Sequence, residues 1–176
     1  MHHCITPILT LHLHSPYFVK ASYIMATIDT IELNEPHPPK ENAIEAFGKV
    51  LDDIKKAIVE SRRHWEKHEP RMWSRAQDLS DAELVNFKLE EDLYLVCSAP
   101  TTYGTIVLGK IRIPAINDAE GEGYIHVRIH DPPNRGTEDV MFHSIFTDEG
   151  ERNENGEASI YRAIQTKDRA LDFFHE

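Results

Sequence analysis

The segment Gly123-Tyr-Ile-His-Val-Arg-Ile-His130 decides how this chain is expected to fold, because apolar and polar residues alternate strictly along it. In an extended chain its three branched apolar residues lie on one side and its polar residues on the other. This period of two is typical of a half-buried β-strand. The polar side carries His126, Arg128 and His130, which form the densest group of chemically capable side chains in the sequence.

Other segments after residue 90 have a similar length and pattern, and stretches rich in Gly, Pro, Asn and Asp separate them. The strands expected from these patterns are 92–98, 104–113, 123–130, 138–147 and 158–165. Because the connections between them are short and contain no helix, consecutive strands should pair antiparallel as a meander. The chain ends in Asp168–Phe174, for which a short helix of one or two turns is expected.

The part of the chain before residue 90 has a helical pattern instead. Apolar residues recur at spacings of three and four over 42–66, which predicts one long helix. Ser80 and Glu83 have the spacing of a capping box, and they predict a short helix over about 81–89. Helices followed by a four- or five-stranded antiparallel sheet define an α+β fold, in which the long helix should cover one face of the sheet.

If this sheet curls, its inner side and the helices would enclose a cavity. This order of elements is similar to the cone-shaped fold shared by nuclear transport factor 2 and many small cyclases and isomerases. The resemblance covers about two thirds of the chain, lies in element order alone and transfers no residues. It implies a cone-like sheet as an expectation, and it implies no activity.

Length and charge limit the class of protein. The 176 residues suit a single domain at 42–176, and we expect 1–41 to be a poorly ordered extension with a Pro-rich lead-in. The composition changes after Met25, which is a candidate for the true start; the alternative is that 1–24 is an imperfect signal peptide. A formal net charge of -11 argues against binding nucleic acid or an anionic membrane through overall charge. No apolar run reaches the roughly 18 residues of a membrane-spanning helix.

The two cysteines, Cys4 and Cys97, form no disulfide framework and no C-x-x-C motif. Cys97 lies in an apolar run, where a buried and unreactive thiol is expected. This cysteine usage is typical of a reducing compartment, so we expect a cytoplasmic protein.

Three interpretations of the polar strand face are open. The first is an ordinary face in contact with solvent. The second is a metal site made by these histidines, His143 of the next strand and a carboxylate such as Asp131 or Asp139. However, His126 and His130 are four residues apart, which is roughly 13 Å on a strand, so they cannot bind the same ion. We therefore assign no metal and no cofactor.

The third interpretation is a pocket for an anionic or polar small molecule. Arg128 would supply the charge, a strand histidine a proton, and Tyr124 or Tyr161 a hydrogen bond. Lys110 and Arg112 share one face of the preceding strand and would extend this basic surface.

Trp65 and Trp73 lie between the two helical regions. Large aromatic residues at such a junction usually pack into a core, but they can also line a ligand pocket. We therefore include both in the candidate ligand-binding set.

No catalytic or phosphate-binding motif is complete in the sequence. The leading hypothesis is a domain that binds a small molecule or a protein partner without demonstrable catalysis. One alternative is a small cofactor-independent isomerase, cyclase or hydrolase, with His126, His130 and His143 as general acid and base. The other is a homodimeric interaction module that uses the sheet edge or the long helix. Histidines in a water-poor cavity with perturbed pKa values would favour the enzyme, whereas an open face would favour binding.

Overall fold

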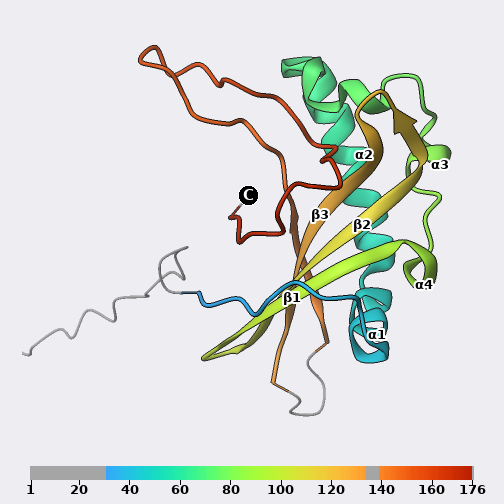
Figure 1. Ribbon diagram of the computed structural model, residues 1–176, viewed down its shortest axis with the longest axis vertical. Coiled ribbons are helices and arrows are strands. Elements are labelled where there is room, and N and C mark those ends of the chain that lie inside the picture. Colours follow the sequence, from blue (N-terminus) through green and yellow to red (C-terminus); the bar gives the residue numbers. More distant parts are fainter. Residues whose placement is uncertain (1–30, 134–138, 176) are drawn as a thin grey trace, which may run out of the picture.

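A computed structural model describes residues 31–133 and 139–175, in which helices precede an antiparallel sheet (Figure 1). The helices are α1 (Glu41–Lys49), α2 (Leu51–His68), the 3₁₀ helix η2 (Pro70–Ala76), α3 (Asp81–Leu84) and α4 (Leu89–Asp92), and the strands are β1 (Leu93–Thr101), β2 (Gly104–Asp118), β3 (Gly121–Asp131) and β4 (Met141–Ile145). The strand order is β1-β2-β3-β4, with every neighbouring pair antiparallel. The predicted α+β fold with a meander is therefore confirmed, and the sheet is open rather than closed into a cone.

The long helix predicted over 42–66 is divided into α1 and α2 in the structure. Val50 stands between them with φ −116° and ψ 14°, outside the helical region. Gly48 lies just before the break, and a glycine lowers the helix propensity at such a position. The predicted helix over 81–89 is also shorter, since α3 ends at Leu84, although the capping box formed by Ser80 is present as predicted.

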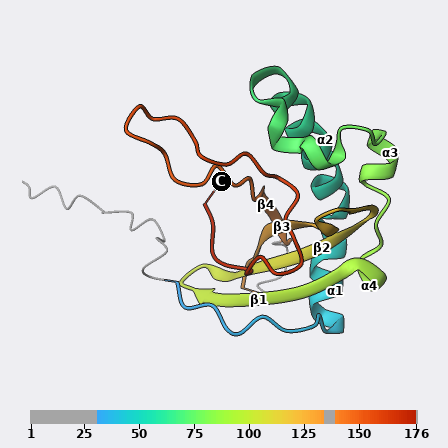
Figure 2. The same cartoon turned by 45° about the horizontal axis from the view of Figure 1, so that its top comes forward.

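Helices α1 and α2 cover one face of the sheet (Figures 1 and 2). The apolar residues of β3 point to this side and are buried in the larger of two hydrophobic clusters, as the alternation in the sequence predicts. That cluster combines residues of α1, α2, η2 and the strands, including Phe47, Ile54, Met72, Ile125 and Val127. None of the helices in the described residues is long and apolar enough to span a membrane.

Close packing of α1 on β2 depends on Gly109. A Cβ at this position would lie 2.4 Å from Cζ of Phe47, and Phe47 is fully buried. We expect Gly109→Ala to lower the free energy of unfolding by about 1–3 kcal/mol, as overpacking does. Gly48→Ala is the matched control, because nothing lies within 4 Å of its added Cβ and its helix propensity rises. Urea denaturation midpoints should therefore move in opposite directions for the two variants, and a common direction would contradict this packing.

The C-terminal part of the chain covers the other face of the sheet (Figure 2). The predicted strand 158–165 contributes only isolated β-bridges, which include the bridge between Gln165 and Tyr124 of β3. The predicted helix at 168–174 is absent, and the chain there is irregular. Its Leu171, Phe173 and Phe174 are buried in the second hydrophobic cluster, together with residues of β1 and β2.

The described part of the lead-in runs along the outer edge of β1. His37 exchanges two backbone hydrogen bonds with Val96, at 2.8 and 2.9 Å. The amide of Ser98 donates to Oδ1 of Asn34 at 2.7 Å. The expectations for 1–24, for Cys4 and for Met25 as the start fall outside the described residues.

Candidate functional site

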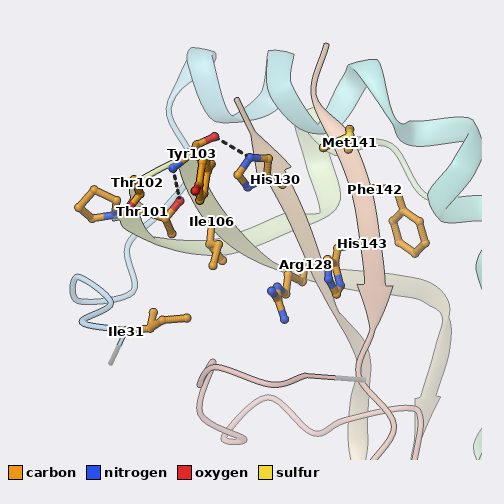
Figure 3. A pocket seen from close by; sticks show the side chains of 11 residues that line it. Ile31, Thr101, Thr102, Tyr103, Ile106, Arg128, His130, Met141, Phe142 and His143 are labelled. Carbon is orange, nitrogen blue, oxygen red and sulfur yellow. Dashed lines mark hydrogen bonds between the residues drawn. The ribbon is translucent and has the colours of Figure 1, made fainter. Parts of the chain in front are cut away.

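A pocket of about 720 Å³ opens where the β1–β2 hairpin approaches β3 and β4 (Figure 3). Eleven described residues line it, and Arg128, His130 and His143 are among them. The apolar part of its wall includes Ile106 of β2 and Met141 of β4. The pocket thus brings together three of the residues that the sequence nominated, from two neighbouring strands.

Strand register explains which polar residues share this face. β2 and β3 pair so that Ile106 opposes His130, and Leu108 opposes Arg128. Two residues further along each strand, Lys110 opposes His126. Residues directly opposite each other in an antiparallel pair project to the same side of the sheet. The nominated residues therefore form a row along one face, and the pocket occupies one end of that row.

An irregularity in β4 places His143. Arg128 opposes Ser144 whereas Ile129 opposes Phe142, so His143 is the extra residue of β4 at this shift in register, as at a β-bulge. The sequence could not assign a side to His143, and the shift in register brings it to the level of Arg128. Its Nδ1 lies 3.0 Å from Oγ of Ser144.

The tip of the β1–β2 hairpin borders the pocket at His130. Nε2 of His130 lies 3.0 Å from the carbonyl oxygen of Tyr103; because a carbonyl only accepts, Nε2 carries the hydrogen and donates it. Gly104 allows this approach. It adopts φ +135°, and a Cβ there would lie 2.3 Å from the carbonyl oxygen of Asp131. A glycine is therefore required to hold Tyr103 over the end of β3.

Arg128 connects the pocket to the C-terminal segment. Its Nη1 donates a hydrogen bond of 3.0 Å to the carbonyl oxygen of Phe174. Its guanidinium carbon also lies 4.8 Å from the centre of the Phe173 ring, a cation–π distance. The charge is thus held in a fixed place at the pocket wall.

His126 and Lys110 lie outside the pocket, beneath the C-terminal segment. Each is 1 % exposed, so the interpretation of this face as solvated is wrong for both. Nζ of Lys110 donates to the carbonyl oxygens of Lys167 and Arg169, at 2.6 and 2.7 Å. His126 stacks on Phe146 with 6.0 Å between ring centres. These two side chains support the fold.

Burial shifts the pKa of both groups. Loss of hydration, together with the charges of Lys110 and Arg169, lowers the pKa of His126 to about 3. Loss of hydration also lowers the pKa of Lys110. The most strongly perturbed histidine is therefore a neutral imidazole enclosed by protein, and it does not line the pocket.

Two further nominated residues form ion pairs and hydrogen bonds at the far end of the row. Arg112 donates to Oδ1 of Asp92 at 2.7 Å and lies 3.4 Å from Glu122. The hydroxyl of Tyr124 donates to Glu122 at 2.9 Å. Burial and this hydrogen bond raise the pKa of Tyr124 to about 12. Neither residue lines the pocket.

The remaining candidates lie on the helix side of the sheet. Tyr161 lies under the guanidinium of Arg71, 4.7 Å from it, and packs against the larger hydrophobic cluster. Trp73 is buried in that cluster, and Trp65 packs against its rim. The structure therefore places both tryptophans with the core, which is the more ordinary of their two expected roles.

Eight of the eleven lining residues were not nominated by the sequence, and Tyr103 and Met141 are among these eight. Tyr103 sits at the tip of the β1–β2 hairpin and Met141 begins β4. Tyr103 falls in the connection between the predicted strands 92–98 and 104–113. A large aromatic residue immediately before the turn glycine is the signal that could have identified it.

The lining residues determine what the pocket can bind. Three of them are Arg or His, and none of the described lining residues is Asp or Glu. In the described residues no group of three or more His, Cys, Asp or Glu side chains could hold a metal ion. Comparison with protein-family models, with curated proteins and with solved structures finds no match to this chain. Function must therefore be argued from the pocket itself.

Proposed function

We propose that the chain is a binding domain whose pocket takes a small molecule with one anionic group and an apolar body. The observation that carries this proposal is a contrast in charge. The chain has a formal net charge of -11, yet the described residues around this pocket supply Arg128, His130 and His143 without any carboxylate. A basic pocket in an acidic protein attracts anions locally while the rest of the surface repels them.

The apolar share of the lining determines the other half of the ligand. Ile31, Ile106 and Met141 give the pocket an apolar wall beside its basic side chains. Ligand sites usually combine such a wall with a few polar groups that fix orientation. Organic carboxylates, phosphates and sulfonates have matching chemistry, and a guanidinium can hold any of them through two parallel hydrogen bonds.

The geometry favours binding over catalysis. His126, which has the perturbed pKa, is enclosed beneath the C-terminal segment and does not line the pocket. Ser144 lies beside His143, but its hydroxyl donates to the carbonyl oxygen of His175 at 3.1 Å. A serine nucleophile would instead donate its proton to the imidazole. No observation in the pocket therefore supports the alternative of an acid–base enzyme.

Binding of anilinonaphthalene sulfonate, a fluorescent amphipathic anion, tests the proposal. We expect saturable binding to the full chain, and a dissociation constant about tenfold or more weaker for Arg128→Gln, since a hydrogen bond to a charged group contributes about 1.5–3 kcal/mol. His130→Ala with His143→Ala should also weaken binding. His64→Ala is the matched control, because His64 is an exposed residue of α2 away from the pocket.

Arg128 also holds the C-terminal segment, so thermal melts must accompany the titrations. Arg128→Lys retains the positive charge and should recover part of the affinity. If Arg128→Gln stays folded and binds the probe as tightly as the unaltered chain, the proposed function is wrong. Equal losses in the pocket variants and in His64→Ala would overturn it as well.

A further inference from the structure

A second cavity adjoins the first. It also measures about 720 Å³ and shares four lining residues with it: Thr102, Tyr103, His130 and Met141. In Figure 3, His130 stands between Tyr103 and Met141 at the end of the first pocket. The four residues therefore form a common wall, and a ligand that crosses this wall would occupy both cavities.

The common wall exposes apolar surface. Tyr103 is 77 % exposed and Met141 is 56 % exposed, the highest values among large hydrophobic side chains in the described residues. Exposed apolar side chains that gather at one place mark a binding surface more often than isolated ones do. Both of these residues border the two cavities, so the exposed apolar surface and the cavities coincide.

The two cavities differ in charge. The first has Arg128 and His143 in its wall. Among the described residues, the second is lined instead by Pro132, Pro133 and Asp139, in addition to the common wall. An anionic group is therefore favoured in the first cavity and disfavoured in the second. The second cavity suits an uncharged chain.

We propose that the two cavities bind one elongated molecule, a long-chain monocarboxylate. Its carboxylate lies at Arg128 and His143, and its hydrocarbon chain passes over Tyr103, His130 and Met141 into the second cavity. This inference rests on the proposed function, because it places the anionic group in the same pocket. It adds the ligand class and assigns Tyr103 and Met141 as the residues that determine chain-length preference.

Titration of the full chain with octanoate and dodecanoate, both below their micelle concentrations, tests the inference. Burial of each added methylene can raise affinity up to about fourfold. We expect dodecanoate to bind at least tenfold more tightly than octanoate. Tyr103→Ala combined with Met141→Ala should remove most of this gain, so that the ratio of the two affinities falls toward one. The backbone carbonyl that accepts from His130 remains in the double variant.

Ile160→Ala is the matched control, because Ile160 is another exposed large hydrophobic residue and does not line either cavity. It should leave the ratio of the two affinities unchanged. Dodecanedioate should bind more weakly than dodecanoate, and Asp139→Asn should reduce that difference, since the second carboxylate would then meet a neutral amide.

The outcomes separate the two proposals. Equal affinities for octanoate and dodecanoate would overturn this inference and leave the proposed function standing. Failure of anilinonaphthalene sulfonate and both carboxylates to bind would overturn both. A chain that sediments with phosphatidylcholine vesicles containing oleate, but binds no dodecanoate in solution, would also overturn the inference, because the ligand proposed here is the free acid.

Discussion

A chain that ends at Gln165 is expected to lose its cooperative thermal transition, because the residues removed complete the second hydrophobic cluster. Leu171, Phe173 and Phe174 are buried against β1 and β2. Burial of such side chains contributes about 1.5–3 kcal/mol each, so together they supply roughly 5–9 kcal/mol. The total stability of a domain is typically about 5–15 kcal/mol, and the deletion removes a large part of it.

The same deletion removes hydrogen-bond acceptors from the buried Lys110 and from the half-buried Arg128. Lys110 would lose the carbonyl oxygens of Lys167 and Arg169, and Arg128 would lose that of Phe174. The loss matters most for the buried Lys110, because a buried charge without partners costs several kcal/mol more than a paired one. The polar and apolar losses therefore act in the same direction.

Cys97 provides a direct measurement of this deletion. Its thiol is buried against Leu171, and burial raises its pKa to about 12, so it should react slowly with a disulfide reagent in the full fold. Chains that start at Met25 lack Cys4 and report Cys97 alone. The 25–165 chain should react fast and melt without a sharp transition. The 25–176 control should react slowly and melt as the full chain does.

Two outcomes would count against this role of the C-terminal segment. The first is a 25–165 chain that melts within a few degrees of the 25–176 chain. The second is a thiol of Cys97 that remains slow to react after the deletion. Either result would mean that the sheet does not need the segment as a cover.

The sequence predicted β3 well, because its alternation records the two environments of a sheet. It could not predict what covers the polar side. Leu171, Phe173 and Phe174 have a spacing that a helix also allows, and this favoured a helix at the end of the chain. In the structure, Lys110 of β2 and Arg128 of β3 donate to carbonyl oxygens of this segment, although both strands are far from it in the sequence. One of these carbonyls belongs to Arg169, and a helix would use it internally.

The candidate site was predicted only in part, because alternation in the sequence shows which side of the sheet a residue is on but not what covers that side. Parity placed His126, Arg128 and His130 on one face, which the register confirms. The alternation of residues along a strand contains no information on burial, however. It therefore could not distinguish the buried His126 from His130 at the pocket. The side of the sheet on which His143 lies depends on the register of β4, because a shift of one residue moves a side chain to the other face. Tyr103 lines the pocket because its turn approaches β3, and this contact between residues far apart in the sequence could not be predicted from the sequence.

Lowering the pH from 7.5 to 5 is expected to destabilise the fold by about 2 kcal/mol through His126 alone. The pKa of this imidazole is about 3 in the folded chain, against an ordinary value of 6.5. The unfolded chain therefore binds the proton first. The contribution to stability is complete above about pH 6.5, and it is lost progressively as the pH falls from there toward 3.

Several groups pack around His126 and determine the sign of this effect. Lys110 of β2 and Arg169 of the C-terminal segment are both cationic, and Phe146 stacks on the ring. Among the described residues no carboxylate is a cause of the shift in the pKa of His126, so none of them compensates a charge on the imidazole. Carboxylates such as Asp118, whose hydrogen bond to Arg75 lowers its pKa, lose stability only at lower pH. The interval from pH 5 to pH 7 therefore reports His126.

Urea denaturation at pH 7.5, 6 and 5 measures this dependence. His126→Leu removes the titrating group while keeping a side chain of similar size, so its unfolding free energy should change little over the same interval. His64→Leu, at an exposed position of α2, should retain the slope of the unaltered chain. A His126→Leu chain that loses as much stability on acidification as the unaltered chain would show that another group is responsible. Such a result would mean that His126 is accessible enough to take up a proton without opening the cover over the sheet.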